Sequence, residues 1–139
     1  MKKCFFLPLF FLLLGACDMF LGPPTNEDLS PLRVIMTEPG NGQQATGALN
    51  VNVYFSEKVL VLSDVNSVIK VKNLTNVAVT CVVDGHNVDP WSKMLHFWFS
   101  CAPSAPAPND IISISFMTGK LKSADGSFLE DSYSFSYGY

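Results

Sequence analysis

The strongest constraint on the fold is a series of short segments in which apolar and polar residues alternate. In residues 94–101 (MLHFWFSC), Leu95 and Phe97 lie on one face if the segment is extended, and His96 and Trp98 lie on the other. Successive side chains of a strand point to opposite faces. A period of two therefore indicates a strand with one buried and one exposed face. No segment has a sustained helical period, so the sequence predicts an all-β fold.

Seven strand-like segments follow one another between residue 32 and the end of the chain. Turn-forming residues separate them, including Pro39–Gly42, Asp84-Gly85 and Asp125-Gly126. Short antiparallel strands in this number predict an immunoglobulin-like β-sandwich with Greek-key connections. One helical turn is expected near residues 63–67. The predicted strands lie at 32–37, 50–56, 68–73, 77–83, 94–101, 111–116 and 132–139.

The N-terminal residues have the organisation of a secretory signal peptide. Lys2 and Lys3 precede an uncharged apolar run at residues 4–14, which is shorter than the 20 or so residues of a membrane-spanning helix. At the end of this run, the four residues Leu14-Gly15-Ala16-Cys17 resemble the lipobox of bacterial lipoproteins. The resemblance implies that residues 1–16 are removed and that Cys17 carries a diacylglyceryl thioether and an acylated amino group.

Lipidation of Cys17 would hold the mature protein at a membrane, because several acyl chains on one residue give stable anchoring. Residues 17–31 then form a tether rich in Pro, Gly and acidic residues, and residues 32–139 form the domain. The expected location is the bacterial cell envelope, facing the periplasm or the exterior. Either membrane remains possible from the sequence.

The charge of the mature chain argues against nucleic acid as a partner. The full sequence has 9 basic and 12 acidic residues, and loss of Lys2 and Lys3 leaves 7 basic residues and a net charge of −5. Binding to phosphates needs clustered Lys and Arg, which this sequence lacks.

The order of motifs resembles bacterial Ig-like domains of the SbsA type. These begin with a strand and a Pro-x-x-Gly turn, and a second strand then ends in Phe-Ser-Glu; Pro39, Gly42 and residues 55–57 match this pattern. Residues 112–137 resemble the end of the family. The resemblance covers residues 32–139 and implies a binding or spacer module without catalytic residues.

One departure from that family suggests a candidate binding surface. Residues 86–93, after Asp84-Gly85, look like an inserted loop with Trp91 at its tip. Trp91 would then reach His96 and Trp98 on the outward face of the next strand, and displayed aromatic residues are typical of surfaces that recognise sugars or proteins. Alternatively, Trp91 folds down onto Trp98 and only covers the strand.

Cys81 and Cys101 are expected to form a disulfide. If the hairpin between them is centred on Trp91, the two residues lie opposite each other and both point inward. An extracytoplasmic compartment allows such a bond to persist. Cys4 leaves with the signal peptide and Cys17 is lipidated, so neither competes for this pairing.

The sequence contains no motif for catalysis, a cofactor or a metal site, so we expect a non-enzymatic protein. The preferred function is a membrane-anchored binding or adhesion module whose partner is an envelope protein or glycan. One alternative is an accessory subunit of a larger envelope complex, in contact through the edges of the sandwich or the Ala-Pro-rich residues 102–108. Another is a copper carrier resembling CopC, with ligands from Met94, His96, His86 and Met117.

Overall fold

The computed structural model describes residues 31–61, 64–89, 91–129 and 131–139. The predicted signal peptide, Cys17 and the predicted tether up to residue 30 lie outside the described residues. Within the described ranges, no helix is long and apolar enough to cross a membrane.

The described chain consists of nine strands and one short helix. All seven predicted strands are present, and the expected helical turn is α1. The two additional strands, β3 and β8, have three residues each and pair with one another. In chain order the elements are β1 (Val34–Glu38), β2 (Asn50–Phe55), β3 (Val59–Val61), α1 (Val65–Val68), β4 (Ile69–Asn73), β5 (Thr80–Asp89), β6 (Met94–Ala102), β7 (Ile111–Phe116), β8 (Leu121–Ser123) and β9 (Tyr133–Gly138).

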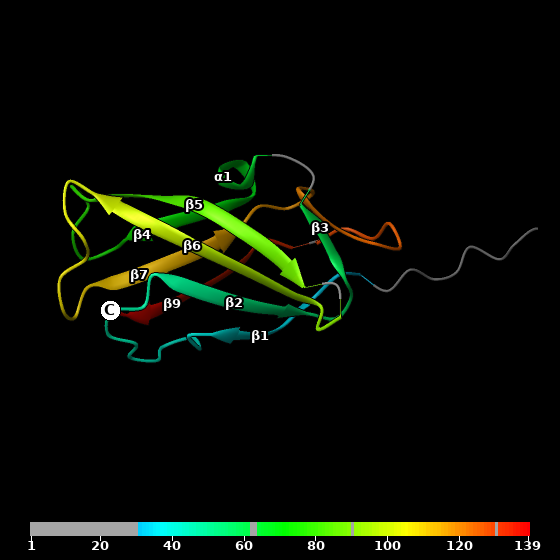
Figure 1. The fold of residues 1–139 in the computed structure, drawn as a ribbon, viewed down its shortest axis with the longest axis horizontal. Helices are drawn as coiled ribbons and strands as arrows, with labels where there is room; N and C mark the ends of the chain where they lie inside the picture. Colours follow the sequence, from blue (N-terminus) through cyan, green and yellow to red (C-terminus); the bar gives the residue numbers. More distant parts are fainter. Residues whose placement is uncertain (1–30, 62–63, 90, 130) are drawn as a thin grey trace, which may run out of the picture.

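The seven longer strands form one hydrogen-bonded series that folds into two layers. Its order is β1-β2-β6-β5-β4-β7-β9, and all its pairs are antiparallel. β4 and β5 are joined at a single position, Lys72 opposite Thr80, where the series bends from one layer into the other. β1-β2-β6-β5 and β4-β7-β9 are therefore the two sheets (Figure 1). This is the strand order of a constant-type immunoglobulin domain, and it confirms the predicted β-sandwich.

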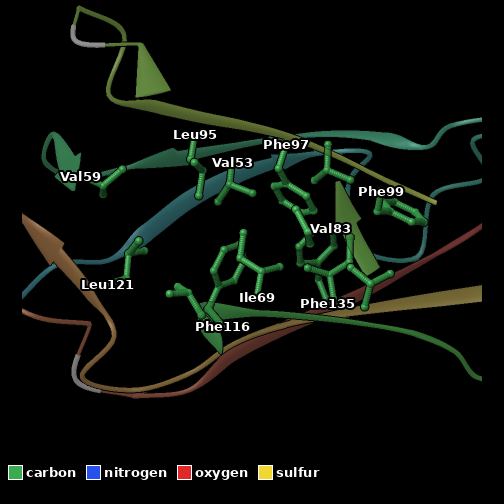
Figure 2. Close-up of a cluster of buried hydrophobic side chains, with 14 of the residues drawn as sticks. Val53, Val59, Ile69, Val83, Leu95, Phe97, Phe99, Phe116, Leu121 and Phe135 are labelled. Carbon is green, nitrogen blue, oxygen red and sulfur yellow. The ribbon is translucent and has the colours of Figure 1, made fainter. Parts of the chain in front are cut away.

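The core lies between the two sheets and is built from the apolar positions of the alternating segments. Figure 2 shows Leu95 and Phe97 of β6 pointing toward Ile69 of β4 and Phe116 of β7. All four side chains are at most 1% exposed. The ring of Phe116 packs edge-on against Phe97, with 6.3 Å between ring centroids, so the two sheets are joined through aromatic contacts.

A buried polar pair fixes the long crossover between β6 and β7. The Asn73 side chain donates a hydrogen bond of 2.6 Å to Asp110, and the two residues are 4% and 6% exposed. Asp110 also accepts from the Ala107 N–H at 2.9 Å. Because both buried side chains have partners, they avoid the cost of unsatisfied polar groups. The Ala-Pro-rich crossover is thereby bound to the end of β4.

Candidate binding face

The β5–β6 hairpin differs from the prediction in its length and in the place of its turn. Residues 86–89 continue β5 and pair with residues 94–97, so they do not form a loop. Asp84-Gly85 is not a turn but an irregularity in the register, where the partner of Val83 is Phe99 and that of Gly85 is Trp98. One extra residue in a strand is a β-bulge. The described residues of the turn at the tip are 91–93.

The bulge makes room for the indole ring of Trp98 on the outward face of the sheet. A Cβ on Gly85 would lie 2.3 Å from Cζ2 and 2.8 Å from Cε2 of Trp98, so the ring lies directly against the glycine backbone. Its other neighbour is His96, with 5.8 Å between ring centroids. Trp98 keeps 40% of its surface exposed. The sheet thus presents a flat aromatic surface to solvent.

A row of polar side chains crosses the sheet beside this ring. His96 Nδ1 lies 2.7 Å from Asn52 Oδ1, and the Asn52 amide nitrogen donates to Glu38 at 3.2 Å. The hydroxyl of Tyr54 donates to the same Glu38 carboxylate at 3.2 Å. Partial burial and this hydrogen bond raise the pKa of Tyr54, so the phenol stays protonated and remains a donor. We call Glu38, Asn52, Tyr54, His96 and Trp98 the Trp98 face.

Trp91 does not belong to this face. Its side chain is 91% exposed at the tip of the hairpin, so it neither covers Trp98 nor packs on the sheet. β6 begins at Met94, directly after the tip, and Trp98 lies four residues further along this strand. At about 3.3 Å per residue, roughly 13 Å of strand separates them. The prediction of one surface formed by Trp91, His96 and Trp98 is therefore wrong for Trp91, whereas His96 and Trp98 lie together.

The hydrogen bonds of the tip hold Trp91 in its outward position. Asp89 accepts from the Trp91 N–H at 2.8 Å and from the Ser92 hydroxyl at 2.6 Å. The bond from Ser92, followed by that from Trp91, lowers the pKa of the Asp89 carboxyl. The amine of Lys93 donates to the Ser56 carbonyl at 2.7 Å, which ties the tip to the turn after β2. The tip is thus a defined structural element.

Of the residues considered for copper, Met94 and His96 share the outward face of β6, but His86 and Met117 do not join them. In the register of the hairpin, Asn87 pairs with His96 and His86 pairs with Phe97, so the two histidines lie on opposite faces. Met117 follows β7, in the other sheet. Among the described residues there is no group of three or more His, Cys, Asp or Glu side chains that could hold a metal ion.

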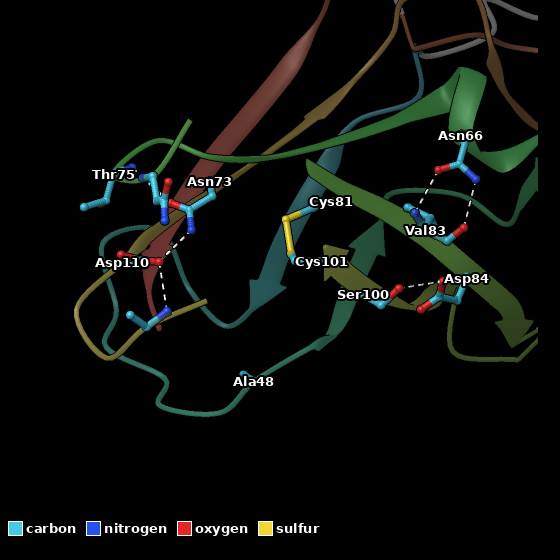
Figure 3. Close-up of a disulfide and its surroundings, with 12 residues drawn as sticks. Ala48, Asn66, Asn73, Thr75, Cys81, Val83, Asp84, Ser100, Cys101 and Asp110 are labelled. Atoms are coloured by element: carbon cyan, nitrogen blue, oxygen red, sulfur yellow. Dashed lines mark hydrogen bonds between the residues drawn. A yellow bond between two sulfur atoms is a disulfide. The ribbon is translucent and has the colours of Figure 1, made fainter. Parts of the chain in front are cut away.

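The predicted disulfide between Cys81 and Cys101 is present and closes the end of the hairpin remote from the tip (Figure 3). The two residues pair directly, with a Cα–Cα distance of 4.0 Å. Both are partly buried against the core. The Asn66 side chain of α1 adds a second fastening, because it donates to the Val83 carbonyl and accepts from the Val83 N–H, both at 2.8 Å. β5 is thereby fixed at two positions that precede its bulge.

Alanine at Gly85 is expected to displace Trp98 while leaving the sandwich folded. The added Cβ would overlap the indole ring, and overpacking of this kind typically costs about 1–3 kcal/mol. With Trp91→Phe as background, the emission and near-UV circular dichroism of Trp98 should change. Gly40→Ala is the matched control, because its nearest neighbour would lie at 3.4 Å. An unchanged Trp98 spectrum would show that the ring does not rest on this glycine.

Sequence reasoning identified two residues of the Trp98 face and missed the others. Alternation in residues 50–56 places Asn52 and Tyr54 on one side of their strand, but it does not show which strand lies beside it. Glu38 and Gly85 gave no signal, because their roles depend on contacts with residues distant in the chain.

No protein-family model and no curated protein match the chain. Among solved structures, one titled as surface layer protein SbsC, domains 1-6, is similar with a TM-score of 0.58 and 10% identity; the match covers 80% of this chain and 14% of that one. Another is CopC from Methylosinus trichosporium OB3b, with a TM-score of 0.49, 14% identity and coverage of 77% and 91%. Membership of the SbsA-type family remains a prediction. The likeness to the surface layer protein concerns the fold, and with the strand order it shows that the described part of the chain forms an immunoglobulin-like β-sandwich.

Proposed function

We propose that this protein is a non-catalytic module of the bacterial cell envelope, lipid-anchored at Cys17, whose Trp98 face binds a glycan. The lipobox-like residues Leu14 to Cys17 support the anchor. The Cys81–Cys101 disulfide supports a location outside the cytoplasm, since such bonds persist in oxidising compartments.

The observation that carries the proposal is the flat, half-exposed ring of Trp98 beside a row of hydrogen-bonding groups. A sugar ring has an apolar face, which stacks on an indole, and a rim of hydroxyls, which needs donors and acceptors. His96 lies against the ring, and Asn52 and Tyr54 continue this row of donors and acceptors across β2, away from the ring. Their bonds to one another hold them in place before a ligand arrives, which reduces the entropic cost of binding.

The size and openness of the face also fit an extended glycan better than a small molecule. The Trp98 face lies on three neighbouring strands, β1, β2 and β6, and their outward side chains are at least partly accessible to solvent. Small ligands are usually held in concave pockets that surround most of their surface. A polysaccharide of the envelope can instead lie across an open sheet.

Retention of the lipidated protein by purified envelope polysaccharide would test this function. Trp98→Ala is expected to weaken retention by about tenfold or more, because loss of a central aromatic contact removes much of the binding energy. Trp91→Ala is the matched control and should bind as the unmodified protein does. Equal retention of both variants would exclude the Trp98 face. Co-purification with a membrane protein, without retention by glycan, would instead favour an accessory subunit.

A further inference from the structure

The hairpin tip and the beginning of the described chain lie at the same end of the sandwich (Figure 1). Hydrogen bonds connect both of them to Ser56, in the turn after β2. The N–H of Arg33 donates to the Ser56 hydroxyl at 3.0 Å, and the Ser56 N–H donates to the Arg33 carbonyl at 2.9 Å. Lys93, in the tip, contacts the same Ser56 through its amine. We call this end, with Arg33, Ser56, Trp91 and Lys93, the entry pole.

We propose that the entry pole docks on the lipid bilayer, with Trp91 placed in the interfacial layer between acyl chains and headgroups. This inference rests on the proposed anchoring at Cys17. The predicted tether joins Cys17 to the domain at this pole, so the anchor and the exposed indole would face the same membrane.

The chemistry of the pole suits a membrane interface. Trp is enriched at membrane interfaces, because its large apolar ring can enter the lipid while its N–H stays near water and headgroups. Trp91 is 91% exposed, so its whole ring is free to enter such an interface. Arg33 is exposed at the same pole and suits lipid phosphates.

The charges closest to Trp91 are already satisfied within the protein. The Asp89 carboxylate accepts from the Trp91 N–H and the Ser92 hydroxyl. Lys93 forms an ion pair with Glu57 at 3.4 Å. Glu57 is therefore compensated by Lys93, and the Asp89 oxygens have donors, while Asp89 keeps its negative charge. Because Asp89 holds the turn, the indole is presented in advance of contact.

The length of the chain before the domain allows this contact and favours it over docking of the opposite end. Fourteen residues, 18–31, can span at most about 50 Å, at roughly 3.3–3.6 Å per residue. β6 has 9 residues and is about 30 Å long, so the disulfide end lies that much further from the anchor. Docking by the entry pole would leave the Trp98 face on the side of the domain, open to a polymer that runs along the membrane.

Quenching by brominated lipid tests the docking. The lipidated protein is reconstituted into vesicles of phosphatidylethanolamine and phosphatidylglycerol, with or without bromine on the acyl chains. The chain has two Trp residues, so Trp98→Phe reports Trp91 alone and Trp91→Phe, the matched control, reports Trp98 alone. The expected result is a loss of about half or more of the Trp91 emission and a blue shift, with Trp98 nearly unchanged.

The possible outcomes separate the docking from the anchor. Co-flotation of the protein with vesicles establishes the anchor, and Trp91 quenching then establishes the docking. If the protein floats but Trp91 is quenched no more than Trp98, the entry pole does not meet the bilayer and the docking is overturned. A protein that does not float overturns the anchor and, with it, the docking.

Discussion

Phe116→Ala is expected to lower the free energy of unfolding by about 3–5 kcal/mol, the range found when buried phenylalanine is truncated. The side chain is 0% exposed and lies on β7. Its ring meets Phe55 and Phe97 of the opposite sheet edge-on, at centroid distances of 6.1 and 6.3 Å. Truncation would leave a cavity between the sheets, because the strands around it are held by their own ladders and cannot collapse fully.

Urea unfolding followed by circular dichroism would measure the loss. A typical domain has only about 5–15 kcal/mol of stability, so Phe116→Leu provides a milder second variant if the alanine variant does not fold. Phe128→Ala is the control, since that ring is 42% exposed and has the amine of Lys122 over it, 5.5 Å from its centroid. It should cost less than about 1 kcal/mol. Similar losses for Phe116→Ala and Phe128→Ala would contradict the aromatic contact between the sheets.

The faces of the strands were predictable because alternation is a local property of the sequence. Leu95, Phe97 and Phe99 point inward and His96 and Trp98 outward, as their positions in the chain require. In the predicted strand at residues 111–116, the same alternation places Ile112 and Ile114 on one face, and both side chains are buried.

The short strands and the bulge were not predictable, because they depend on contacts between segments that are distant in the sequence. β3 and β8 have three residues each, too few to establish a period, and they exist because they pair with one another. Asp84-Gly85 is a common turn pair, but here the glycine serves a close contact with Trp98. That contact is visible only when both strands are in register.

The misplacement of Trp91 follows from the same limit. Extension of β5 by residues 86–89 carries the tip away from Trp98, along the axis of the sheet. With those residues in a loop, the three aromatic side chains could have converged. The strand assignment instead separates them into two sites, one on a sheet face and one at a pole.

Replacing both Cys81 and Cys101 by alanine is expected to cost about 3 kcal/mol of stability. The two residues are separated by 20 positions, and closing a loop of that length in the unfolded chain accounts for this amount in the chain-entropy model. The urea midpoint should fall by roughly 1–3 M, for a slope of 1–3 kcal/mol per molar. Reduction of the unmodified protein should cause the same fall, and the alanine variant should be insensitive to reductant.

Trp98 offers a more informative readout of the same variant. It is three residues from Cys101, but the ladder of β6 and the Asn66–Val83 hydrogen bonds also hold the hairpin in register. Removing the disulfide should therefore lower global stability and leave Trp98 emission and glycan retention nearly unchanged in the folded state. If binding falls as stability does, the disulfide positions the Trp98 face itself. If neither binding nor stability falls, the crosslink does not destabilise the unfolded chain, and the entropic account of its contribution is wrong.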